Sequence, residues 1–156
     1  MRVSKTKARA KAKTKAKATI GWVCPDCGRR FGRANQSHGC APAMTADVYF
    51  AARPENDRLI YEAVMRCLAT FDDVTVDCVS VGVLFKRSRT FAELRPKRVG
   101  MSLAFLLSRT VEDERIAKTL KTSAHRVVHY VDVVKPRDID RVVRTWLAEA
   151  FASSTV

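Results

Sequence analysis

The sequence contains no apolar run long enough to cross a bilayer, for which a helix needs about 20 consecutive apolar residues. Its basic beginning also lacks the apolar stretch of a secretory signal peptide, which argues against a secreted, disulfide-linked protein. Glycine-rich phosphate loops, G-x-S-x-G elbows and H-E-x-x-H helices are missing as well. We therefore expect a cytoplasmic protein that does not enter the membrane and carries none of these enzyme motifs.

Acidic residues are absent from residues 1–18, which contain eight lysines and arginines among small residues. This segment has nothing to bury, so we expect a disordered Lys/Ala-rich tail. Such a tail binds polyanions by neutralising phosphates, although a merely solubilising extension is the alternative. Because it holds eight of the thirteen net positive charges, the rest of the chain carries only +5.

Four metal-ligand side chains lie within the seventeen residues CPDCGRRFGRANQSHGC. Cys24 and Cys27 have the C-x-x-C spacing with which one tight turn directs two thiolates at one ion, and His38 and Cys40 follow as H-x-C. The pattern predicts a structural zinc site in a compact knuckle over residues 19–42, with no coordination position left for a catalytic water. Few apolar side chains are available here, so metal binding must supply most of the local folding free energy.

Three other interpretations of these four residues remain open: a disulfide, a redox dithiol and coincidence. A disulfide fits a secreted chain, which the missing signal peptide disfavours. A redox C-x-x-C is typical of a βαβ pattern and leaves His38 and Cys40 without a role. The other cysteines, Cys67 and Cys78, have apolar neighbours and are expected to be buried thiols in a reducing compartment.

Residues 54–153 are expected to form a second, larger domain after a short linker. Apolar residues recur at helical spacing over 54–71 and 139–151, which predicts an amphipathic helix at each end. A short helix is also expected over 111–120, because acidic residues at its start suit a helix N-terminus.

Alternating apolar residues predict four strands in the same domain. The resulting order is helix, three strands, helix, strand, helix. It indicates an α+β fold in which a curved, mainly antiparallel sheet carries helices on one face. The predicted strands are 74–79, 83–87, 99–107 and 125–134.

Two groups of cations outside the tail are candidate phosphate contacts. Arg29, Arg30 and Arg33 lie on the predicted knuckle. The second group, over 86–98, is interspersed with phenylalanines that offer stacking surfaces, and it forms one positive patch if its strands flank a single loop. The alternative is a solvated strand edge whose cations prevent edge pairing. The second group consists of Lys86, Arg87, Arg89, Arg95, Lys97 and Arg98.

His125 and His129 are four residues apart on a predicted strand, where one of them could act as a general base with Asp77. No nucleophile accompanies them in a recognised motif. A nuclease-type cluster is also incomplete, because Asp77 and Lys86 fall on successive strands but Leu84 replaces the acid expected two positions before the lysine. We interpret these histidines as structural and lean towards a protein that is not an enzyme.

Several segments together resemble a bacterial, mostly actinobacterial family that carries the domain of unknown function 5655 behind a zinc knuckle. The resemblance covers about residues 22–152. It implies the metal ligands named above and places Arg87, Phe91, Pro96 and His129 at characteristic positions of the second domain. The family name implies no activity. The segments are CPDCGRRFGRANQSHGC, FAARPENDRLIYEAV, FKRSRTFAELRPKR, the strand ending in HYVDV, and DIDRVVRTWLAEAF.

Two functions are compatible with these features. The first is a zinc-stabilised, non-enzymatic module that binds nucleic acid, most simply DNA, through phosphates and with little sequence specificity. The second is a protein-interaction or small-ligand-binding module whose sheet face receives a partner and whose basic tail is incidental. Binding that survives removal of residues 1–18 would favour the first.

Overall fold

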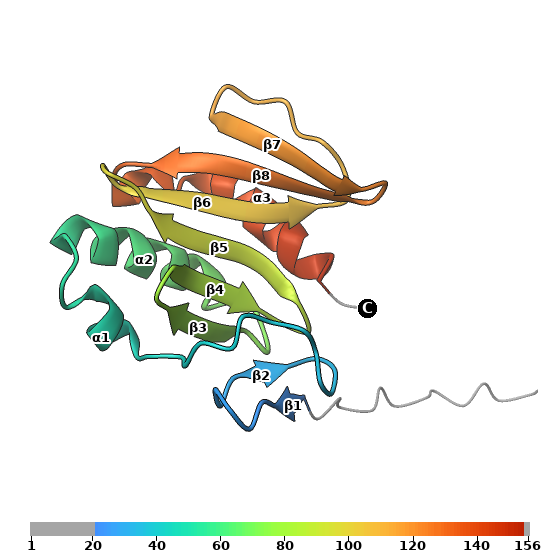
Figure 1. The fold of residues 1–156 in the computed structure, drawn as a ribbon. Coiled ribbons are helices and arrows are strands. Elements are labelled where there is room, and N and C mark those ends of the chain that lie inside the picture. The colour runs from blue at the N-terminus through green and yellow to red at the C-terminus, as the bar shows by residue number, and fades with distance from the viewer. Residues whose placement is uncertain (1–20, 155–156) are drawn as a thin grey trace, which may run out of the picture.

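The computed structural model describes residues 21–154, so the predicted tail lies outside the described range. Figure 1 shows a small two-stranded unit beside one edge of a six-stranded sheet. Neighbouring strands in both sheets are antiparallel, which confirms the predicted α+β class with a mainly antiparallel sheet.

The strand order of the large sheet is β3-β4-β5-β6-β8-β7. Consecutive strands are joined by hairpins except between β6 and β7, where the chain passes to the outer edge and then returns as β8 beside β6. The connections 87–89 and 124–125 therefore lie at the same end of the sheet, which is also the end nearest the two-stranded unit (Figure 1). We use the name knuckle for residues 21–40, which contain the two-stranded unit, and call this end of the sheet the knuckle end. The strands are β3 (Thr75–Val79), β4 (Gly82–Lys86), β5 (Thr90–Pro96), β6 (Met101–Leu107), β7 (Ile116–Ser123) and β8 (Arg126–Val133).

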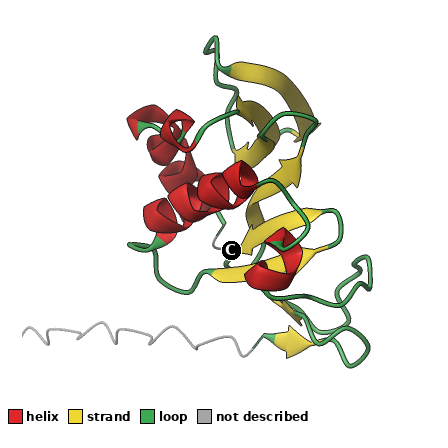
Figure 2. Cartoon of the chain, turned by 90° about the vertical axis from the view of Figure 1, so that its left-hand side faces the viewer, coloured by secondary structure: helices red, strands yellow, loops and turns green. Residues whose placement is uncertain are grey.

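Helices α2 (Glu55–Leu68) and α3 (Arg141–Ala152) lie on one face of the sheet, as the alternating pattern predicted (Figure 2). Their apolar stripes and the inward-facing strand residues form the core, in which the Trp146 and Phe105 rings stack at 5.4 Å between centroids. Helix α3 begins where the Asp140 carboxylate accepts the backbone N–H groups of Val142 and Val143 at 3.0 Å.

The helix expected over 111–120 is wrong, because this segment leads into the edge strand β7. The acidic residues that resembled a helix start have a different partner. The Asp113 carboxylate accepts the backbone N–H of Arg115 at 3.0 Å and its guanidinium at 2.9 Å, and this contact lowers the pKa of Asp113 to about 2. Pairing with β8 then satisfies the backbone groups of β7, which no local signal in the sequence reveals.

Three further elements were not predicted. Strand β5 runs through the basic segment, and helix α1 (Ala46–Phe50) and the 3-10 helix η1 (Pro136–Asp138) lie in segments predicted as loops. In addition, the strand predicted over 99–107 begins only at Met101. Gly100 instead forms the tight turn after β5, with a φ of +68° and no room for a Cβ, which would lie 2.2 Å from the Val133 carbonyl oxygen.

Candidate metal centre and arginine cleft

The two-stranded unit brings the four predicted ligands together. Cys24 and Cys27 lie on the turn between β1 (Trp22–Val23) and β2 (Arg30–Phe31). The turn closes through a backbone hydrogen bond of 2.9 Å from the Gly28 N–H to the Cys24 carbonyl, and Gly28 adopts a φ of +70° that glycine tolerates best. The chain after β2 then folds back and returns His38 and Cys40 to the same place.

The ligand atoms of these four residues all lie within 4.8 Å of one another. The Cys24 and Cys40 sulfurs are 3.7 Å apart, and the Cys27 sulfur is 3.4 Å from Nε2 of His38. A tetrahedral ion with sulfur ligands at about 2.3 Å separates its ligand atoms by roughly 3.6 to 3.8 Å. The cluster is therefore close enough to bind one metal ion.

His38 is oriented by its other ring nitrogen. Nδ1 lies 2.6 Å from the Gln36 carbonyl oxygen, which accepts a hydrogen bond and so assigns the proton to Nδ1. The lone pair on Nε2 then faces Cys27. Phe31 supports this orientation because its ring centroid lies 4.0 Å from that of His38.

The thiols of the cluster differ in acidity. The backbone N–H of Cys27 is the main cause that lowers the pKa of Cys24 to about 7, whereas the neighbouring Cys24 sulfur raises the pKa of Cys40 to about 12. A metal ion that binds here would therefore displace protons from the thiols. All five cysteines are free, and the separation of 3.7 Å between Cys24 and Cys40 far exceeds a disulfide bond of about 2.05 Å.

A buried ion triad joins the two-stranded unit to the large sheet. The Asp77 carboxylate on β3 accepts Nε of Arg29 at 3.1 Å and also pairs with the Lys86 ammonium on β4. All three side chains are at most 7% exposed. Each cation also has a second partner, since Arg29 donates to the Gly39 carbonyl at 3.0 Å and Lys86 donates to the Arg30 carbonyl at 2.7 Å.

The triad removes two residues from the predicted phosphate contacts. Arg29 and Lys86 are buried against Asp77, so neither presents its charge to a ligand at the surface. Sequence spacing alone had grouped them with exposed cations. The carboxylate that pairs with them is 48 residues from Arg29 in the chain.

The predicted single patch over 86–98 is divided by strand β5. Arg87 and Arg89 lie at the knuckle end, whereas Arg95, Lys97 and Arg98 lie at or beyond the far end of a seven-residue strand, roughly 20 Å away at about 3.3 Å per residue. Arg95 pairs with Glu93 on its own strand, and Lys97 pairs with Asp132 at 2.7 Å. Arg87 rests on the Phe151 ring at 4.5 Å.

Tertiary structure instead assembles another group of cations at the knuckle end. Arg33 from the knuckle, Arg89 from the β4–β5 turn and Arg126 from the start of β8 line one cleft of about 520 Å³, which we call the arginine cleft. The sequence analysis missed Arg126, because no local feature distinguishes it from other exposed cations. Its position follows only from the strand order. The other lining residues are Gly32, Gln36, Ser88 and Thr90.

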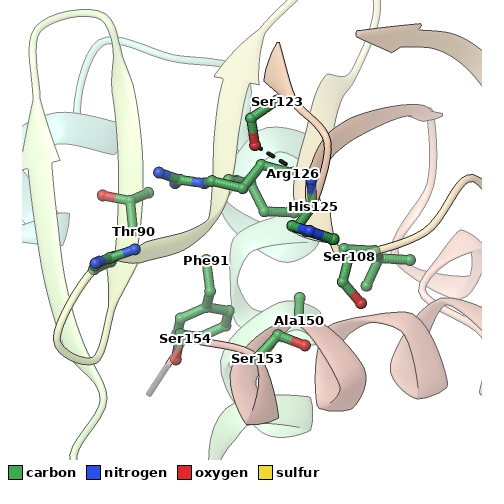
Figure 3. Close-up of a pocket in the computed structure, with 12 residues that line it drawn as sticks. Thr90, Phe91, Ser108, Ser123, His125, Arg126, Ala150, Ser153 and Ser154 are labelled. Carbon is green, nitrogen blue, oxygen red and sulfur yellow. Dashed lines mark hydrogen bonds between the residues drawn. The ribbon is translucent and has the colours of Figure 1, made fainter. Parts of the chain in front are cut away.

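A second pocket of about 330 Å³ adjoins the arginine cleft and shares Arg89, Thr90 and Arg126 with it (Figure 3). It lies between the knuckle end of the sheet and the C-terminal end of α3. We call it the side pocket. Its remaining lining consists of Phe91, Leu106, Leu107, Ser108, Ser123, His125, Ala150, Ser153 and Ser154.

The two histidines of the predicted strand have different environments. His129 is fully buried, stacks on Phe105 at 5.4 Å and accepts the Val111 backbone N–H at Nε2 over 2.9 Å. His125 is exposed on the turn before β8 and lines the side pocket. Asp77 is on the opposite edge strand, four strand spacings or about 19 Å from β8. A catalytic site that combines Asp77 with either histidine is therefore wrong.

Burial lowers the pKa of His129, which makes stability depend on pH. Below about pH 6.5 the unfolded chain binds a proton that the folded protein takes up less readily, so the free energy of unfolding should fall by up to about 1.36 kcal/mol per pH unit. His129→Gln, which retains an acceptor for Val111, should show a smaller loss between about pH 7 and pH 5 in urea denaturation. Protonation of the candidate metal ligands affects the wild-type protein and the variant alike. Identical dependence of the free energy of unfolding on pH in the two proteins would contradict this prediction.

With the geometry established, comparison with known proteins identifies the class. A family model described as "Domain of unknown function (DUF5655)" matches residues 46–154. The chain belongs to this family. The match runs from α1 through α3 and leaves the four candidate metal ligands outside. Comparisons with curated proteins and with solved structures gave no match. Among residues 21–154, no helix is both long and apolar enough to span a membrane.

Proposed function

We propose that the chain is a zinc-stabilised, non-enzymatic module that binds nucleic acid, principally DNA, through its phosphates and with little sequence specificity. The convergence of Arg33, Arg89 and Arg126 from three separate segments into one cleft carries this proposal. No acidic residue is among the described residues that line the cleft. Guanidinium groups suit phosphate because their planar forks donate two parallel hydrogen bonds.

Zinc is the metal that this donor set favours. Three cysteine sulfurs and one imidazole nitrogen lie close together, and these soft donors suit a tetrahedral ion whose four positions would all be occupied by protein. Such a site stabilises a fold and offers no open position for a substrate or water. The ion would hold in place Arg30 on strand β2 and Arg33 on the loop that lines the arginine cleft.

Low sequence specificity follows from the shape of the proposed surface. Turns and loops surround the arginine cleft, and residues 32–40 of the knuckle form no helix that could enter a major groove. Contacts from turns to phosphates position a strand without reading bases. The basic tail over 1–18 would add further attraction of the same sequence-independent kind.

The test is fluorescence anisotropy of a labelled random duplex with zinc-loaded protein, with and without residues 1–18, over a range of salt concentrations. Arg126→Ala and Arg33→Ala should each weaken binding and reduce the slope of log K against log salt by about 0.9 for each phosphate that the variant no longer neutralises. Arg98→Ala is the matched control, because Arg98 is an exposed cation at the opposite end of the sheet.

Two outcomes would contradict the proposal. If all binding disappears with residues 1–18, the folded part has another role, and the protein- or small-ligand-binding alternative gains. If Arg98→Ala weakens binding as much as Arg126→Ala, the attraction depends on net charge and does not involve the arginine cleft.

A further inference from the structure

The side pocket next to the arginine cleft has the properties of a site for a flat, polar-edged group attached to an anion. We propose that it holds one unpaired nucleobase of a strand whose phosphate lies in the arginine cleft. This inference rests on the proposed nucleic-acid binding and adds what that proposal leaves open, namely which form of nucleic acid the protein prefers.

The two cavities are adjacent. Arg89, Thr90 and Arg126 line both, so one ligand can contact both cavities through these residues. Figure 3 shows Arg126 and His125 on one side of the side pocket and Ser153 and Ser154 of the α3 end on the other. No acidic residue occurs among the described residues that line either cavity, so no negatively charged side chain repels an anion there.

The lining of the side pocket provides surfaces for a base. Phe91, Leu107 and Ala150 are at most 2% exposed and contribute an apolar wall. The His125 ring and the Arg126 guanidinium are exposed flat groups of the kind that stack on bases. A volume of about 330 Å³ lies at the lower end of the range for small-molecule sites, which is roughly 300 to 1,000 Å³.

Hydroxyl groups supply hydrogen bonds to a base edge. Ser153 donates to the Glu149 carbonyl at 2.9 Å and Ser154 to the Phe151 carbonyl at 2.6 Å, which leaves their oxygens as acceptors for the N–H groups of a base. The Ser108 hydroxyl has no protein partner among the described residues and can donate or accept. Groups with such adaptable roles accept several bases, consistent with low specificity.

A base inside a duplex cannot occupy this site, because it is stacked and paired within the helix. The side pocket therefore gives a preference for single strands, frayed ends or extruded bases over closed duplex. Simple phosphate binding predicts no such preference.

The experiment uses the full zinc-loaded chain and two labelled single strands that differ only in one terminal nucleotide, which is adenine in one and abasic in the other. Stacking of one base contributes about 1 to 3 kcal/mol, so the adenine strand should bind about 5- to 150-fold more tightly. Ser108→Phe, which fills the pocket from an exposed position, should abolish this difference and preserve affinity for the abasic strand. Ser80→Phe, an exposed position on the β3–β4 turn, is the matched control.

Each outcome separates the two proposals. Equal affinity of the wild-type protein for both strands would overturn the base pocket but leave phosphate binding intact. No binding of either strand would overturn the proposed function. In that case, binding of free adenosine monophosphate that Ser108→Phe abolishes would still support a base pocket, with a free nucleotide as its ligand. If adenosine monophosphate does not bind, the base pocket is overturned as well.

Discussion

Cys27→Ser should abolish stoichiometric metal binding and unfold the segment over residues 21–40. Apparent metal-binding free energies of about 10 to 16 kcal/mol stabilise small zinc units, and this one has few apolar contacts of its own. Trp22 and Phe31 are its main apolar contacts, with ring centroids 6.0 Å apart. Native mass spectrometry would count the bound metal, and hydrogen exchange would report the loss of protection in residues 21–40.

Cys67→Ser provides the matched control, because Cys67 lies on α2 outside the metal cluster. It should retain one metal ion and normal protection of the knuckle. Protection within the six-stranded sheet should persist in Cys27→Ser, since the large core is formed by the sheet, α2 and α3. A metal-free Cys27→Ser protein with a fully protected knuckle would show that the ion does not stabilise this unit.

Asp77→Ala should lower the free energy of unfolding by about 3 to 5 kcal/mol, an effect typical of removing one partner from a buried ion pair. The reason is that Arg29 and Lys86 would remain buried without a counter-charge, with side chains only 6% exposed. Urea denaturation of the metal-loaded protein measures the change. The substitution should also loosen the contact between knuckle and sheet, visible as faster hydrogen exchange in β2.

The matched control for Asp77→Ala is Asp132→Ala, which breaks the exposed pair with Lys97 and should change stability by no more than about 1 kcal/mol. A second variant, Asp77→Ala combined with Lys86→Met, removes one of the two uncompensated charges and should recover part of the loss. If Asp77→Ala and Asp132→Ala lower the free energy of unfolding by the same small amount, the buried triad does not hold the knuckle against the sheet.

The triad and the metal cluster are physically connected. Arg29 lies two residues after Cys27, and its guanidinium also donates to the carbonyl of Gly39, next to Cys40. Arg29 therefore belongs to the first arm through its backbone, while its side chain contacts the second arm and the carboxylate on β3. This arrangement sets the position of Arg33 relative to Arg89 and Arg126, on which the proposed phosphate contacts depend.

Features governed by short-range spacing were predictable from the sequence. The four candidate metal ligands, the apolar stripes of α2 and α3, and the alternation along β8 each depend on residues within a few turns or strand repeats. Such patterns encode direction directly: two cysteines in C-x-x-C face one point, and His129 faces the core with Val131.

Features governed by partners far along the chain were decided only by the tertiary structure. Strand β7 exists because β8 completes its hydrogen bonds, and β5 is buried although charged residues surround it in sequence. Arg29 and Lys86 are interior because Asp77 is placed between them, and Arg126 reaches the arginine cleft because β8 lies beside β6. The sequence thus determined the candidate metal ligands and most helices and strands. Strand pairing determined which cations are buried and which converge, because the charge of a residue carries no information about distance across a sheet.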